Sequence, residues 1–183
     1  MHSPSVCEAE FRTACSKFPT GVSIATVVAN QTPYGMTVAS FTSVSLDPCL
    51  VLVCIDHRAQ MAKLLSVGTY IGINVLANDQ QALSERFSKN WRERFAGISW
   101  YPGSTGVPLL TGVLATFECC IGAMVPAGDH LIVIAQVVQV NSTNGDPLVY
   151  VNRCYTRIAM DDPRRGPAHG SHANEVRAVF AGK

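Results

Sequence analysis

The stretch GMTVASFTSVSLDPCLVLVC, residues 35–54, joins a hydroxyl-rich half to an almost wholly apolar half. We call residues 37–45 the hydroxyl-rich segment, because most of its positions carry a hydroxyl: Thr37, Ser40, Thr42, Ser43 and Ser45. In an extended chain alternate side chains face opposite ways, and neither face of this segment would be cleanly apolar. We therefore predict that it leaves regular pairing between Phe41 and Ser45 and turns. Pro48 then closes the bend before a buried strand at 49–55.

A bend lined with hydroxyls and backbone N–H groups is a good cradle for a phosphate or a polyol, because each hydroxyl can both donate and accept. Neutral donors hold an oxyanion more weakly than an Arg fork does, so a ligand held this way can leave. Arg58 follows the next strand and can add one cation, with a helix N-terminus beside it. The alternative is a Thr-rich edge strand with solvated hydroxyls. The residues alone leave both interpretations open.

The bulk composition predicts one well-buried globular domain. The chain has 183 residues, of which 48% are hydrophobic and 15% charged. A formal net charge of +1 gives no reason to expect a nucleic acid or an anionic membrane as partner. No apolar run approaches the roughly 20 residues that span a bilayer. Acidic residues stand where a signal peptide would be apolar, so we expect a cytoplasmic protein.

The seven cysteines are predicted to be reduced thiols rather than disulfides or zinc ligands. Their number is odd and no two have C-x-x-C spacing. Four of them lie in apolar strand-like runs, where a thiol behaves as a small hydrophobic group and should be buried: Cys49, Cys54, Cys119 and Cys120.

The remaining periodicity predicts a chain made mostly of turn-linked strands. Strands are expected at 21–29, 49–55, 69–77, 112–125, 130–140 and 148–158, the last as one strand or a pair. Turns are expected at 30–35, 126–129 and 141–147, and helices at 8–18, at 58–68 and at 78–95 with Asn78 as the cap. Because strands and helices do not alternate regularly, we expect an antiparallel barrel with appended helices. Trp91 and Trp100 should cover it.

Two further patterns bound the interpretation. No G-x-G-x-x-G follows the first strand and no G-x-x-x-x-G-K-[ST] occurs, so the usual dinucleotide and triphosphate cradles are absent from the sequence. After Met160 the chain becomes rich in Pro and Gly. We therefore expect one domain over 1–160 and a flexible tail over 161–183, part of which docks on a partner subunit.

Five blocks in this order resemble the short-chain flavin reductases, the reductase components of two-component flavin-dependent monooxygenases. The blocks are FPTGVSIAT, GMTVASFTSVSLDPCLVLVCI, INVLANDQQALSERFS, AGDHLIVIAQV and DPLVYVNRCY. The resemblance implies a mainly-β split antiparallel barrel of the FMN-binding, Greek-key type with a few flanking helices. It also implies a homodimer that binds FMN or FAD near its interface. NADH or NADPH would reduce the flavin, which then diffuses to a separate monooxygenase.

The resemblance also assigns site residues. The family's hydroxyl-rich flavin loop corresponds to Thr37, Val38, Ala39, Ser40, Ser43 and Ser45. Its second flavin-contacting segment corresponds to Cys54, Ile55, Asp56, His57, Arg58 and Gln60, and two further lining positions to Asn74 and Phe87. His130 matches the histidine associated with the nicotinamide nucleotide, and Tyr155 an aromatic residue near it. Departures from the family pattern leave the choice between FMN and FAD open: Cys49, Cys54, His57, Arg58, Ser88 and Ala135.

Each of these residues has a purely structural alternative. His130 either positions the nicotinamide, without obligatory proton transfer, or is a turn histidine bonded to its neighbour. Asn74 bonds either the flavin or a neighbouring strand, and Arg58 is either a phosphate contact or solvated. Phe87 is a packing residue first and a flavin wall second, whereas Tyr155 is either near the nucleotide or ordinary strand packing.

The sequence is compatible with three functions: a flavin reductase, a carrier that retains its FMN, and an oxidase of the pyridoxamine-phosphate type. The oxidase would need a richer Arg and Lys clamp than this stretch displays. The sparse charge favours release of the flavin over its retention.

Overall fold

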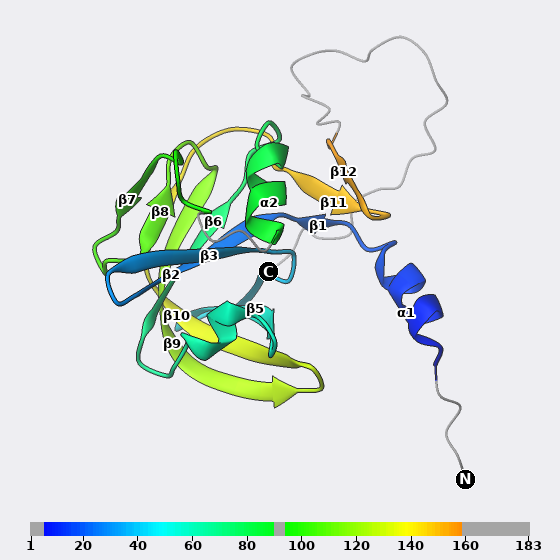
Figure 1. Ribbon diagram of the computed structural model, residues 1–183, viewed down its shortest axis with the longest axis horizontal. Coiled ribbons are helices and arrows are strands. Elements are labelled where there is room, and N and C mark those ends of the chain that lie inside the picture. The colour runs from blue at the N-terminus through cyan, green and yellow to red at the C-terminus, as the bar shows by residue number, and fades with distance from the viewer. Residues whose placement is uncertain (1–5, 90–93, 159–183) are drawn as a thin grey trace.

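The computed structural model describes residues 6–89 and 94–158, which fold around one curved antiparallel sheet (Figure 1). Its seven strands run in the order β3-β2-β6-β9-β10-β5-β4. Their bounds are β2 Ser23–Ala29, β3 Thr32–Val38, β4 Thr42–Leu46, β5 Cys49–Asp56, β6 Tyr70–Val75, β9 Ala115–Ala127 and β10 His130–Ser142. All neighbouring strands pair antiparallel. The predicted mainly-β antiparallel fold class is therefore confirmed.

Smaller elements surround this sheet (Figure 1). β1 (Thr20–Gly21) pairs with the hairpin of β11 (Val149–Val151) and β12 (Cys154–Thr156). A hairpin of β7 (Trp100–Pro102) and β8 (Pro108–Leu110) forms a separate sheet. The helical elements are α1 (Glu8–Cys15), the 3-10 helix η1 (Gln60–Lys63) and α2 (Gln81–Ser88).

The two end strands of the sheet, β3 and β4, are joined by the short link 39–41 and do not pair with each other. The Ser40 hydroxyl fastens this link to β5, because its Oγ accepts from the Cys54 N–H at 2.8 Å and lies 3.2 Å from the Cys54 carbonyl. The break in pairing thus begins before the predicted place, at 39–41. β4 pairs with β5 from Thr42 onward, but with a register shift between Ser43 and Ser45 that lies within the predicted range. Ser40 bridges the break, because its hydroxyl satisfies the backbone of Cys54 just before β4 begins.

Two buried clusters hold the elements together. The first fills the inside of the curved sheet and includes Val53, Ile55, Ile73 and Ile121. The second lies under α2 and includes Ile24, Leu76, Phe87, Leu110 and Leu148. Along β5 burial alternates strictly from residue to residue, as a strand with one face in the core requires. Phe87 anchors α2 in the second cluster and so fixes the end of that helix beside β3.

Several predicted boundaries are wrong in detail. The turn at 30–35 is only two residues long, since Asn30 and Gln31 have positive φ and β3 begins at Thr32. Pro33 is accommodated because β3 is an edge strand, where a missing donor costs little. The helix at 58–68 shrinks to the single turn η1.

The other differences concern the second half of the chain. α2 begins with Gln80 at the N-cap position and not with Asn78, and no side chain caps it. β7 and β8 were not predicted, because a stretch with two prolines and two glycines is not typical of strands. Trp100 packs edge-on against Phe95 at 5.8 Å, whereas Trp91 and the tail at 161–183 lie outside the described residues. No described helix is long and apolar enough to cross a membrane.

All seven cysteines are free. Cys119 is buried, and this burial raises the pKa of its thiol to about 12. Cys54 and Cys120 are half-buried, but Cys49 is exposed, so the prediction that it is buried is wrong. Its position explains the difference, because it begins β5 right after the turn that closes the β4–β5 hairpin.

Glu118 on β9 is a buried carboxylate that organises the β7–β8 loop. Its oxygens accept the backbone N–H and the hydroxyl of Ser104, at 3.1 and 3.2 Å, and those of Thr105, at 2.7 and 2.6 Å. Burial raises the pKa of Glu118, but these hydrogen bonds outweigh burial and lower it overall. Gly103 is required beside it, since a Cβ there would lie 2.5 Å from the carboxylate carbon.

Candidate functional site

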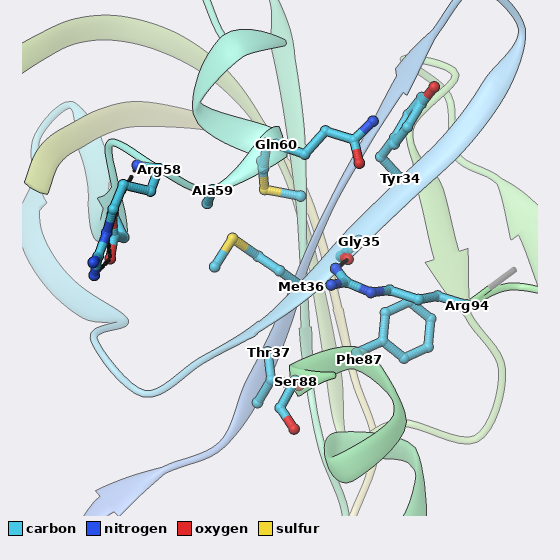
Figure 2. Close-up of a pocket in the computed structure, with 12 residues that line it drawn as sticks. Tyr34, Gly35, Met36, Thr37, Arg58, Ala59, Gln60, Phe87, Ser88 and Arg94 are labelled. Carbon is cyan, nitrogen blue, oxygen red and sulfur yellow. Dashed lines mark hydrogen bonds and ion pairs between the residues drawn. The ribbon is translucent and has the colours of Figure 1, made fainter. Parts of the chain in front are cut away.

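A hollow of about 410 Å³ lies between β3, the segment from β5 into η1, and the end of α2 (Figure 2). Its size is within the usual range for small-molecule sites, about 300–1,000 Å³. Five of its lining residues were predicted from sequence: Thr37, Asp56, Arg58, Gln60 and Phe87. Seven were not: Tyr34, Gly35, Met36, Ala59, Met61, Ser88 and Arg94.

One wall of this pocket is apolar and tightly packed. Phe87 is fully buried, and its ring lies against the backbone of Gly35. A Cβ at Gly35 would meet the Phe87 ring at 2.7 Å, so a glycine is needed for this approach. Met36 and Met61 add polarizable, adaptable surface to the same pocket. Such a wall suits a flat apolar ring system.

Arg94 brings a cation into the pocket (Figure 2). One arm of its guanidinium, Nη1, donates to the Gly35 carbonyl, and Nε donates to the Lys89 carbonyl at 2.9 Å. Burial lowers the pKa of Arg94, although a guanidinium remains protonated in proteins. Sequence reasoning missed this residue, since nothing in the run RERF separates it from its charged neighbours.

A second group of charges lies at the rim, where β5 meets β10. Arg58 donates two hydrogen bonds to the Asp56 carboxylate, from Nη2 to Oδ2 at 2.7 Å and from Nε to Oδ1 at 3.1 Å. This hydrogen-bonded pair holds the pKa of Asp56 far below its usual range. The Arg58 side chain is 86% exposed and points away from the centre of the pocket (Figure 2).

His130 joins this rim because it pairs directly with Asp56 in the β10–β5 ladder. Its Nδ1 lies 2.7 Å from Oδ1 of Asp129, a contact that lowers the pKa of that carboxyl. The ring is thereby oriented through Nδ1, which leaves Nε2 to meet a ligand. The His57 N–H donates to the Asp129 carbonyl at 3.0 Å, so the loop after β5 is fastened to the same turn.

Most of the hydroxyl-rich segment is committed to the fold. Thr37 Oγ1 donates to the Ser84 carbonyl at 2.6 Å, Ser40 binds β5, and Ser45 Oγ accepts the Asp47 N–H at 3.2 Å. Ser43 and Ala39 are exposed, whereas Val38 is buried. Of the residues at the end of β5, Ile55 faces the core and Cys54 is half-buried.

Asn74 lies in the core and not in the pocket. Its Nδ2 donates to the Ile24 carbonyl at 3.1 Å, and its Oδ1 accepts the Leu110 N–H at 2.7 Å. These bonds correspond to the structural alternative for this residue, a link between neighbouring strands. The Tyr155 hydroxyl lies 2.9 Å from the Ser84 hydroxyl, and its ring packs edge-on against Tyr150.

Comparison with known proteins identifies the family to which this fold and pocket belong. Residues 15–159 match the sequence model described as "Flavin reductase like domain", and the chain belongs to this family. It is 40% identical over 149 residues to the FMN reductase (NADH) SmoA of Agrobacterium fabrum, covering 81% of this chain and 85% of that protein.

Two further relatives show the same pattern. The reductase subunit HsaB of a flavin-dependent monooxygenase from Rhodococcus jostii is 34% identical over 152 residues, covering 82% of this chain and 78% of HsaB. The NADH:FAD oxidoreductase SgcE6 of Streptomyces globisporus, solved with NAD and FAD fragments, superposes with a TM-score of 0.81. It is 31% identical, and the match covers 87% of this chain and 99% of that one.

Proposed function

We propose that this protein is an NADH-dependent flavin reductase that reduces FMN or FAD and releases the product. The observation that carries the proposal is the pocket between β3, η1 and α2, whose aromatic wall and inward-facing Arg94 fit a flat ring with anionic oxygens. Membership in the flavin reductase-like family and the names of its relatives support the same reaction.

The chain's own residues would bind and orient the two reactants. A bound flavin accepts a hydride from a nicotinamide, and this chemistry belongs to the cofactors themselves. Phe87 and Met36 offer packing for the ring, while Gln60 and the backbone after β5 offer hydrogen bonds. The predicted residues that line the pocket remain part of the proposed flavin site: Thr37, Asp56, Arg58, Gln60 and Phe87.

His130 is proposed to position the nicotinamide nucleotide at the rim of the pocket. The contact with Asp129 holds its ring, and the pairing with Asp56 places it beside the pocket entrance. Arg58 is already bound by Asp56, and Asp129 adds a second carboxylate, so the rim offers little attraction for the extra phosphate of NADPH. This balance supports NADH as the donor.

We further propose that the protein is a cytoplasmic homodimer that serves a separate monooxygenase through diffusible reduced flavin. Large apolar side chains are exposed on several elements, including Phe18, Leu46, Val138 and Val140. Such surface is typical of an interface. HsaB is named as a reductase subunit of a monooxygenase, which supports the partner, and seven free cysteines fit a reducing compartment.

Purified protein tests the proposal against the carrier alternative. We expect a colourless preparation that consumes NADH only after riboflavin, FMN or FAD is added, and more slowly with NADPH. A preparation that is stoichiometrically yellow and keeps its flavin through gel filtration would instead indicate a carrier. Analytical ultracentrifugation of the same sample tests the dimer, and a monomer at micromolar concentration would contradict it.

A further inference from the structure

Arg94 differs from the other arginine of the pocket in what holds it. Arg58 is exposed and its charge is balanced by Asp56. Arg94 is half-buried, and among the described residues no carboxylate pairs with it. Its partners are two backbone carbonyls, those of Gly35 and Lys89.

A cation in this position is costly unless something negative joins it. Taking a charged group out of water is unfavourable when only neutral dipoles compensate it. The fold nevertheless fixes the guanidinium at two points and aims it into the pocket, beside Gly35 and Phe87 (Figure 2). A surface arginine without a ligand stays exposed and pairs with a nearby carboxylate, as Arg12 on α1 does with Glu8 at 2.8 Å while 69% of its side chain is exposed.

The guanidinium also keeps donors for a ligand. It has five N–H groups in a planar fork, and the two carbonyl contacts use only two of them. The unused donors suit an anionic oxygen, which a guanidinium binds more strongly than a neutral one.

We propose that Arg94 is the anion-binding residue of the flavin pocket and recognises a negatively charged oxygen of the flavin. This inference rests on the proposed function. Two flavin groups supply such an oxygen: the phosphate of FMN, and the ring edge that gains negative charge on reduction. The hydroxyl-rich segment and Arg58 then play a smaller part in anion binding, because their polar groups are largely bound within the protein.

The test measures dissociation constants of the Arg94→Gln and Arg94→Lys variants by titration. The ligands are oxidised riboflavin, oxidised FMN and, under anaerobic conditions, their reduced forms. Arg94→Gln should weaken the binding of the ligand whose negative oxygen Arg94 contacts by about 10- to 100-fold more than it weakens the binding of oxidised riboflavin. If the variant weakens the binding of oxidised FMN more than that of oxidised riboflavin, Arg94 binds the phosphate. If it weakens the binding of reduced riboflavin more than that of oxidised riboflavin, Arg94 binds the ring edge. Arg94→Lys should recover part of either loss.

Three controls keep the outcome clear. Arg12→Gln removes an equal charge from the exposed helix α1 and should leave all four constants unchanged. Thermal unfolding shows whether each variant is folded, and Arg94→Lys serves if Arg94→Gln is not. Equal weakening of all four ligands, or none, would overturn the role of Arg94. A wild-type protein that binds no flavin at all would instead refute the proposed function.

Discussion

Replacing Ser40 by alanine tests whether the hydroxyl-rich segment serves the fold or the ligand. In the structure the Ser40 hydroxyl satisfies both the N–H and the carbonyl of Cys54 near the end of β5. Ser40→Ala removes both contacts and leaves a partly buried strand N–H without its partner. An unsatisfied buried group of this kind costs about 1–3 kcal/mol. We expect a loss of about 2 kcal/mol in the free energy of unfolding.

The matched control is Ser43→Ala, three positions along the same segment. Ser43 is exposed, and surface substitutions usually change stability by less than about 0.5 kcal/mol. For a domain of this size, about 2 kcal/mol corresponds to a melting temperature lower by about 4–8 °C. Urea unfolding followed by circular dichroism measures both variants.

The same two proteins also separate the two roles. If Ser40 is committed to β5, the folded Ser40→Ala protein should bind FMN within about threefold of the wild type, since the O–H and one lone pair of Ser40 are already used by the backbone of Cys54. The reasoning is refuted if Ser40→Ala unfolds like Ser43→Ala. It is refuted equally by a variant of unchanged stability that binds FMN tenfold more weakly.

Three other substitutions address the pocket rim, its wall and the buried carboxylate. His130→Ala should raise the KM for NADH up to about tenfold, the value of one hydrogen bond, with less change in flavin affinity; an unchanged KM would count against its positioning role. Gly35→Ala should displace the Phe87 ring and cost about 1–3 kcal/mol as well as flavin binding, whereas Gly21→Ala, which meets nothing within 4 Å, should do neither. Glu118→Gln should lower the free energy of unfolding by about 1–3 kcal/mol at pH 7. Because hydrogen bonds depress the folded-state pKa of Glu118, the wild type has this stability above its unfolded pKa and loses it as pH falls, so the variant should show a flatter acid limb in urea titrations.

The strands were predictable where buried and exposed side chains alternate along the chain. β5 and the β9–β10 hairpin carry β-branched runs between turn residues, and their pairing fixes one buried face. The β7–β8 hairpin was not predictable, because Glu118, far along the sequence, supplies the hydrogen bonds that shape its loop. α2 was placed correctly but too long, since Phe87 and its packing decide where that helix is held.

The residues of the candidate site also differ in how far the sequence predicted them. The residues that follow β5 sit at the pocket, as expected for a strand end, and so does Phe87. The hydroxyls of the hydroxyl-rich segment carried a strong pattern, but a sequence does not reveal whether a hydroxyl binds a ligand or the chain itself. Arg94, by contrast, lies in the pocket although no sequence pattern marks it, because only the tertiary contact with the Gly35 carbonyl distinguishes it from other surface charges.

The N-terminal helix α1 stands away from the rest of the described chain, and not one of its residues is buried (Figure 1). Deleting it should therefore leave the melting of an isolated subunit untouched. If the helix lies across the second subunit of the proposed dimer, the deletion instead raises the protein concentration at which that dimer separates. Dilution, and not heating, is the perturbation that reveals what this segment contributes.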